Sequence, residues 1–177
     1  IAFAEYTWSG EKRVKKDIKS AYRQREFSCT LAEAEFAFID QLEKPVTFWK
    51  NALLKGDTRN HLHKIKNPIS EAVIDFPDKN NKGQWSAEYS SRLEEAEILS
   101  KRCDSIAEKI KIMKSQAIRN RYSLEVYEQV NKLAQFAPKA LLAFETYDLA
   151  QNKEEEYAAL MRIKQLPEEF TELRKQF

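Results

Sequence analysis

The strongest pattern in the sequence is a stripe of apolar residues between positions 86 and 119, spaced three or four residues apart. This spacing keeps the residues on one face of an α-helix, and an average period of about 3.5 residues is typical of helices that pack almost parallel or antiparallel. We therefore predict a helix with Ser86 as its N-cap and an end near Arg119. Its buried face should carry Tyr89, Leu93, Ala96, Leu99, Cys103, Ile106, Ile110, Met113 and Ala117.

A second apolar stripe follows Ser123 and predicts a partner helix of similar length. Pro138 lies inside this helix, and a proline in a helix interior removes one backbone donor and crowds the preceding turn. We therefore expect a kink or a break near Gln135. The inward face should carry Val126, Val130, Leu133, Ala137, Leu141 and Phe144.

A last helix is predicted over residues 153–166. Three consecutive glutamates at its start, residues 154–156, favour the positive end of the helix dipole. Pro167 should begin a separate turn that carries Phe170 and Leu173. The apolar residues at helical spacing in this last helix are Tyr157, Leu160 and Ile163.

Shorter helices are predicted in the first half of the chain, over residues 10–27, 30–42 and 45–56. Thr30 and Glu33 form the capping-box pattern, whereas Pro45 and Gly56 suit a first helical turn and a helix end. Ser9 is the N-cap candidate for the first of them.

Residues 57–85 form the irregular part of the prediction, and they include a polar loop over residues 77–83. Between the breaks, residues 69–76 could form a short helix. That helix would pack Ala72, Val73 and Phe76 inward.

These patterns together predict an all-α protein, a bundle of long antiparallel helices preceded by shorter helices. Only three glycines and five prolines occur in 177 residues, and the alternating pattern of strands is missing. We divide the chain into a junction segment, residues 1–27, and a helical bundle domain, residues 28–177.

The charge pattern and the lengths of the apolar stretches argue against nucleic acid and membranes as partners. Thirty basic and 28 acidic residues are interspersed and give a net charge of +2, whereas a nucleic-acid-binding surface needs a face of one sign. Acidic residues also dilute the densest basic run, which extends from Lys12 to Arg25. Apolar stretches are only a few residues long, against the roughly 20 of a membrane-spanning helix. We therefore expect neither nucleic acid nor a membrane as a partner.

No pattern predicts a metal, a cofactor or a nucleophile. His61 and His63 are two positions apart, so they do not converge on a zinc ion from either a helix or a strand. Three scattered glycines cannot make a phosphate-binding loop. Cys29 and Cys103 lack metal-ligand spacing, and a disulfide between them stays open. The position of Cys103 on the apolar stripe favours a small buried side chain.

Two groups of residues could contribute to a carbohydrate site. Glu94, Glu95 and Glu97 fall on the polar side of the predicted 86–119 helix, and the glutamates at 154–156 fall at a helix start. We interpret both acidic groups as structural, because a glycosidase needs two acids held about 5–9.5 Å apart across a sugar.

Aromatic side chains are the second group. Trp49 shares a predicted helix face with Val46 and Leu53, which favours a place in the core. Trp85 stands just before the expected N-cap, where packing against the first turn is common. The alternative is a carbohydrate platform made by Trp49 and Trp85 with Tyr122 behind them.

The first thirteen residues contain an apolar segment, then Ala4 and Glu5, two further residues, Trp8, and a following Arg13. This pattern resembles the end of the catalytic barrel in family 20 glycoside hydrolases, the β-N-acetylhexosaminidases. Residues 76–92 and 166–170 are similar to the helical region after the barrel in bacterial members. A similar barrel end also occurs in family 84 enzymes, which likewise carry helical bundles.

The resemblance implies that residues 1–27 are the end of a catalytic barrel or a junction helix. The bundle would then be a non-catalytic C-terminal domain that braces the barrel or mediates contact in a homo-oligomer. The family's Asp-Glu catalytic pair has no counterpart here, so we assign no catalytic residue. Glu5, Trp8 and Arg13 would be packing residues at the junction.

The alternative is a helical protein-interaction module with no enzymatic role. The chain starts at Ile1 and stops within a helical pattern, so we expect it to be a piece of a longer protein. Its localisation stays open, with a periplasmic or secreted parent as one option.

Overall fold

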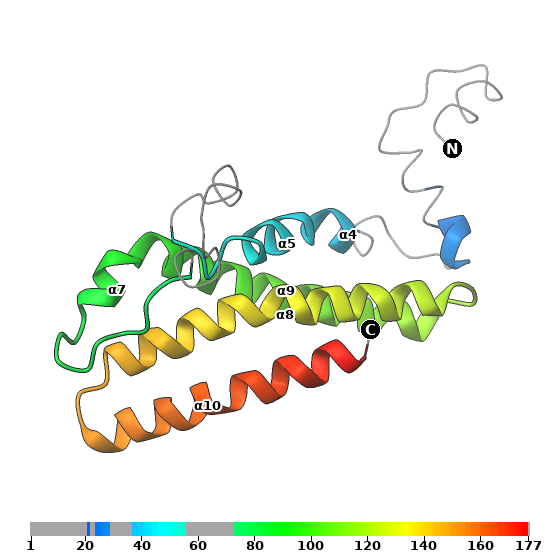
Figure 1. The fold of residues 1–177 in the computed structure, drawn as a ribbon. Helices are drawn as coiled ribbons and strands as arrows, with labels where there is room; N and C mark the ends of the chain where they lie inside the picture. Colours follow the sequence, from blue (N-terminus) through cyan, green and yellow to red (C-terminus); the bar gives the residue numbers. More distant parts are fainter. Residues whose placement is uncertain (1–20, 22–23, 29–36, 56–72, 177) are drawn as a thin grey trace, which may run out of the picture.

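The computed structural model describes residues 21, 24–28, 37–55 and 73–176, and within these ranges it contains helices but no named strand. The three long helices are α8 (Ser90–Gln116), α9 (Arg121–Asp148) and α10 (Lys153–Lys175). Helix α9 runs antiparallel to both α8 and α10 (Figure 1). The shorter helices are α4 (Phe38–Gln41), α5 (Glu43–Trp49) and α7 (Gln84–Glu88). The prediction of an all-α bundle with long helices after shorter ones is confirmed (Figure 1). No described helix is both long and apolar enough to cross a membrane.

Helix α9 is the centre of the bundle. It packs against α8, α10, α5 and α7, and Figure 1 shows α10 on one side of it and α4 and α5 on the other. A helix with neighbours on several sides must be apolar on several faces. Ala140 and Ala143 of α9 accordingly pack with Leu166 of α10, whereas Ala137 and Leu141 belong to the cluster shared with α5, α7 and α8.

The predicted stripe of α8 is confirmed as its buried face. All of its members from Leu93 to Ala117 are buried, and only Tyr89 at the start is partly exposed. The stripe supplies two hydrophobic clusters. Its first half packs with Phe48, Trp85 and Leu141, and its second half packs with Phe38 and Leu124.

The predicted start of this region is wrong in detail. Ser86 is not an N-cap but lies inside α7, which begins after Gly83. Gly83 has φ +80°, a left-handed conformation that glycine adopts without steric cost, so the chain turns there. The helix then breaks at Tyr89 and restarts as α8. It ends at Gln116 because the next residue, Ala117, is extended.

Of the two outcomes that we predicted for the partner helix, the break near Gln135 is wrong, and the kink stays a prediction. Helix α9 starts two residues before Ser123, and it continues through the fully buried Pro138. A proline inside a helix costs roughly 3 kcal/mol. Burial of Ala137 and Leu141 beside it offsets that cost, because each apolar side chain removed from water stabilises the fold.

Helix α10 likewise continues through Pro167, where we predicted a separate turn. Contacts on both sides of this proline hold the helix together. Phe170 stacks on Phe136 of α9 with ring centroids 5.0 Å apart, and Arg162 pairs with Glu169 across the proline. The face that packs on α9 contains Ala159, Ile163 and Leu166, whereas Tyr157 and Leu160 are exposed.

The segment before α7 differs from the predicted short helix. Val73 forms an isolated antiparallel bridge with Leu54, and the Ile74 amide donates to the Leu53 carbonyl at 3.0 Å. Successive side chains of an extended segment point to opposite sides. Ile74 is therefore buried, whereas its neighbour Val73 is 40% exposed. Phe76, which we also expected to face inward, is 48% exposed.

Other short elements are only partly described. Residues 24–27 are helical, α5 ends at Trp49 instead of Gly56, and the polar loop over residues 77–83 is confirmed. The remaining parts of the helices predicted over 10–27 and 30–42 lie outside the described residues. The division at residue 27 stays a prediction.

Candidate functional site

The aromatic residues considered for a carbohydrate platform are not brought together. Trp85 is buried, but it lies inside α7 and not before an N-cap as we predicted, and its Nε1 donates to the Asp75 carbonyl at 2.8 Å. Trp49 is 42% exposed at the end of α5, so the prediction that it belongs to the core is wrong, and Phe48 takes the buried place. Tyr122 is 76% exposed at the start of α9, next to the last turn of α8. Helix α5, which carries Trp49, lies beside the first turns of α8 instead.

The predicted structural acids stay on the surface. Glu94, Glu95 and Glu97 are exposed on α8, and Glu97 forms an ion pair with Lys101 at 2.6 Å. The glutamates at 154–156 occupy the first turn of α10, as predicted. Asn152 caps that turn by accepting hydrogen bonds from the amides of Glu154 and Glu155 at 3.1 and 2.9 Å.

Cys103 is buried and free, which confirms its interpretation as a small core side chain. Burial raises the pKa of the Cys103 thiol to about 11, so it is protonated at neutral pH and is no nucleophile. His61, His63 and Cys29 lie outside the described residues, and so do Ala4, Glu5, Trp8 and Arg13. Within the described ranges, no group of His, Cys, Asp or Glu could hold a metal ion.

An open groove of about 910 Å³ separates α5 from the start of α8. Charged and polar side chains line it together with the aromatic rings of Phe48 and Tyr89. The lining residues that matter for its chemistry are Glu43, Phe48, Glu88, Tyr89, Arg92 and Glu95. We call this feature the α5–α8 groove.

Arg92 is the best-positioned charge in the α5–α8 groove. Its Nη1 donates to the carbonyls of Ala52 and Leu54 at 3.1 and 2.7 Å, and its guanidinium carbon lies 5.3 Å from the centroid of the Tyr89 ring. These contacts fix the guanidinium and also satisfy the carbonyls that end the α5 region. Burial and the neighbouring Glu88 carboxylate raise the pKa of the Tyr89 phenol.

A second polar cluster joins α7 to the end of α9. Asp148 is fully buried, and its Oδ2 accepts from the amide and the hydroxyl of Ser86 at 2.9 and 2.7 Å. The Ser86 amide belongs to the first turn of α7, whose amides have no partner within the helix. Asp148 therefore caps α7 from 62 positions away.

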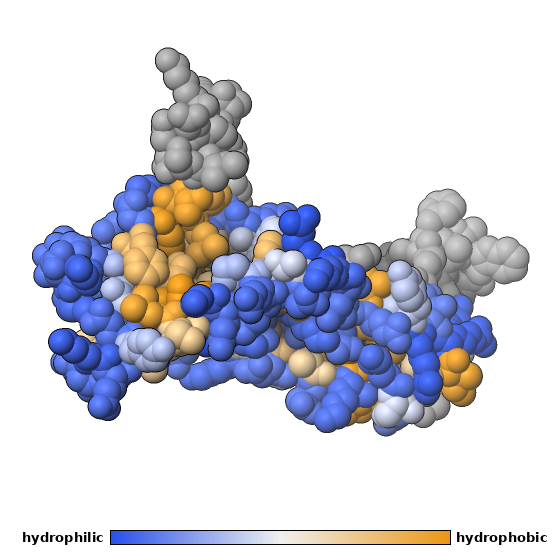
Figure 2. All heavy atoms as spheres, turned by 60° about the horizontal axis from the view of Figure 1, so that its bottom comes forward, coloured by the Kyte–Doolittle hydropathy of each residue, from blue (hydrophilic) through white to orange (hydrophobic). Residues whose placement is uncertain are grey.

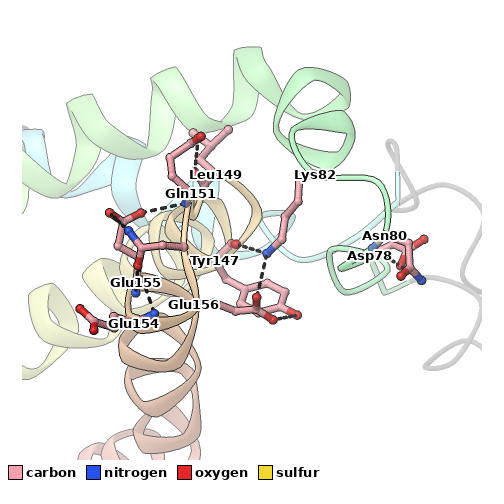
Figure 3. Close-up of polar contacts among 10 residues, drawn as sticks. Asp78, Asn80, Lys82, Tyr147, Leu149, Gln151, Glu154, Glu155 and Glu156 are labelled. Carbon is pink, nitrogen blue, oxygen red and sulfur yellow. Dashed lines mark hydrogen bonds and ion pairs between the residues drawn. The ribbon is translucent and has the colours of Figure 1, made fainter.

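Lys82 holds the loop before α7 against the same end of α9. Its Nζ donates to the Tyr147 carbonyl at 2.9 Å and lies 4.2 Å from the centroid of the Tyr147 ring (Figure 3). The Tyr147 hydroxyl lies 3.5 Å from Glu156 of α10. Burial, and then the Glu156 charge, raise the pKa of this phenol. The cluster fixes the turn between α9 and α10.

Hydrophobic atoms gather over one end of the face drawn in Figure 2, whereas most of the rest of that face is hydrophilic. Val73 and Phe76 are the exposed apolar residues of the extended segment before α7. The Phe76 ring packs on Phe144 and Tyr147 of α9, with centroids 5.5 and 5.1 Å apart. We call Phe76 and Phe144 the Phe76 patch.

The described residues assemble no catalytic centre that we can recognise. The Ser86 hydroxyl is buried against Asp148 with no base beside it in the described chain, so the pair caps a helix and does not activate a nucleophile. Comparisons of the chain with protein-family models, with curated proteins and with solved structures found no match. The function must therefore be argued from the surface features alone.

Sequence reasoning missed Asp148 and Lys82 as junction residues. Both act on partners more than 60 positions away in the sequence, and no local pattern contains such a partner. The weak local signal at Arg92 was its place in the segment 76–92, which carries part of the resemblance.

Proposed function

We propose that this chain is a non-catalytic helical domain that attaches to a larger partner surface. The partner that we favour is the catalytic barrel of a β-N-acetylhexosaminidase in the same parent chain, with the bundle bracing that barrel. The Phe76 patch supports the proposal, because the Phe76 ring packs on Phe144 and Tyr147 and is still 48% exposed, so it offers apolar surface that a neighbouring domain would cover. The resemblance of residues 1–13 supports the choice of a barrel.

The first experiment reads the coding sequence immediately upstream of residue 1. We expect a barrel sequence with the family's adjacent Asp-Glu pair. The 177-residue chain, incubated without its parent protein with a chromogenic N-acetylglucosaminide, should release no product. Hydrolysis by the chain alone, or an upstream sequence without such a barrel, would overturn the proposal.

The second experiment tests the patch in the parent protein. Phe76→Ser should lower the cooperativity of thermal unfolding between barrel and bundle, because it weakens the contact between them. Ile98→Ser is the matched control, since Ile98 is 60% exposed on α8 and does not belong to the Phe76 patch. An equal effect of the two variants would count against barrel contact at this site.

A helical protein-interaction module is the second candidate, and one observation favours it. Helix α10 packs mainly against α9, and its opposite side exposes Tyr157, Leu160 and Met161 at helical spacing. Such a stripe fits a partner helix. The upstream sequence distinguishes the candidates, because this second function requires no barrel.

A further inference from the structure

The α5–α8 groove has the dimensions of a small-molecule site. Its volume of about 910 Å³ falls within the roughly 300–1,000 Å³ that such sites occupy. One wall is α5 and the other is the end of α7 with the first turns of α8. Buried Phe48 and half-buried Tyr89 give it an apolar base.

Arg92 lines this groove and uses only part of its hydrogen-bonding capacity on described residues. A guanidinium carries five N–H donors, and the two on Nη1 face the carbonyls of Ala52 and Leu54. The donors on Nε and Nη2 form the fork that binds a carboxylate with two parallel hydrogen bonds. Within the described ranges, no carboxylate forms an ion pair with Arg92. Among the described residues, Nη1 therefore holds the cation in place, while Nε and Nη2 have no hydrogen-bond partner.

Carboxylates line the same groove. Glu43 comes from α5 and Glu95 from α8, and neither has an ion pair or hydrogen bond in the part of the chain that the structure describes. Glu88 is the third, beside the Tyr89 hydroxyl. Three carboxylates against the cations Arg92 and Lys44 disfavour a doubly charged phosphate. They favour a ligand that brings an ammonium group together with one carboxylate.

We propose that the α5–α8 groove binds a zwitterionic α-amino acid with an apolar side chain. The ligand carboxylate pairs with the Nε and Nη2 donors of Arg92, and its ammonium group faces Glu43 and Glu95. Its side chain lies over Tyr89. This site is independent of the Phe76 patch, so the two proposals stand or fall separately.

The test uses the whole chain labelled with ¹⁵N and titrated with L-phenylalanine. We expect saturable chemical-shift changes that concentrate on the amides of residues 88–92 and on the Arg92 Nε–H. L-phenylalaninamide lacks the carboxylate and N-acetyl-L-phenylalanine lacks the ammonium group, and each should bind roughly tenfold more weakly or worse. Shifts spread over the whole surface, or equal binding of the amide, would overturn the proposal.

Two matched pairs of variants test the residue assignments. Arg92→Lys keeps the charge but loses the fork, so binding should weaken by about tenfold, whereas Arg102→Lys on α8 outside the groove should leave it unchanged. Glu95→Gln should weaken binding severalfold and its neighbour Glu94→Gln should not. Circular dichroism verifies the fold of each variant. If Arg92→Lys fails to fold, the glutamate pair decides, and equal binding by both glutamate variants refutes the site.

Discussion

The two halves of α9 carry the same apolar spacing, yet they are buried to different extents. In the second half, Ala137 and Leu141 are buried, and Leu141 is fully so. In the first half, Val126 is 37% exposed and Val130 and Leu133 are only partly covered. We predicted all five as inward-facing from one continuous pattern, together with Phe144, which is partly buried against the second-half cluster.

The neighbours of the two halves explain the difference. The second half meets α5, α7 and α8 in one cluster and α10 in another. The first half contributes Leu124 to the cluster with α8, but no described element closes over Val126. Periodicity therefore identifies the faces of a helix, whereas burial depends on elements that lie elsewhere in the sequence.

The largest expected effect comes from Leu141→Ala in the well-covered half. Removing a fully buried leucine leaves a cavity, so the free energy of unfolding should fall by roughly 2–5 kcal/mol. Leu133→Ala in the other half is the matched variant and should cost about 1 kcal/mol, because its side chain is partly hydrated already. Urea unfolding followed by circular dichroism measures both. Equal losses would mean that the two halves are covered alike.

The next effect concerns the polar contact that closes the covered half. Asp148→Ala removes the cap of α7 and leaves the Ser86 amide buried without a partner, which should cost about 1–3 kcal/mol. Ser86→Ala removes only the hydroxyl contact and should cost less. Hydrogen exchange should report faster opening of α7 in Asp148→Ala. Unchanged protection at residues 84–88 would refute the capping role.

These contacts explain which parts of the structure the sequence could predict. The α8 stripe was predictable because its buried residues share one face, and local spacing records that face directly. Ser86 resembled an N-cap by type and position, but α7 begins earlier, after Gly83. The Ser86 amide instead donates a hydrogen bond to the Asp148 carboxylate at the end of α9. Local sequence rules also predict helix breaks at Pro138 and Pro167. These rules do not consider the packing against neighbouring helices that keeps α9 and α10 continuous.

The candidate site was less predictable than the fold. Arg92 gains its role from the carbonyls of Ala52 and Leu54, about forty residues earlier, and from the ring beside it. Its spacing in α8 resembles that of any surface arginine. The prediction that Trp49 is buried was wrong for a related reason. The neighbouring Phe48, and not Trp49, faces the cluster shared with α8 and α9.

A smaller effect of opposite sign is expected at Asn131, where the two halves of α9 meet. Its Nδ2 donates to the Cys103 carbonyl at 2.9 Å, but within the described chain its buried Oδ1 has no partner. Asn131→Leu removes that unsatisfied atom, so the free energy of unfolding should rise by about 1 kcal/mol. A buried polar residue in a helix seam fixes register, and light scattering should show additional oligomeric species in this variant. Lower stability would contradict the account.

The smallest effect concerns the sparsely covered half, where an ion-pair network connects α9 to α8. Glu128 contacts Lys114 at 2.8 Å and Lys132 at 2.9 Å, and hydrogen bonds to these lysines lower the pKa of its carboxyl below 4.5. A lowered pKa in the folded state means that the contribution is complete above the unfolded pKa and is lost as the pH falls through the folded value.

Glu128→Gln should therefore cost less than about 1 kcal/mol at pH 7, because the side chain is partly exposed and screened by water. The difference in unfolding free energy between the wild-type protein and Glu128→Gln should vanish in acid. It should also shrink in 1 M salt, because charges are then screened beyond a Debye length of about 3 Å. Urea unfolding at pH 7 and in acid measures this difference in the free energy of unfolding. A difference that persists in acid would mean that Glu128 contributes by packing, and that the first half of α9 is better covered than its exposed valine indicates.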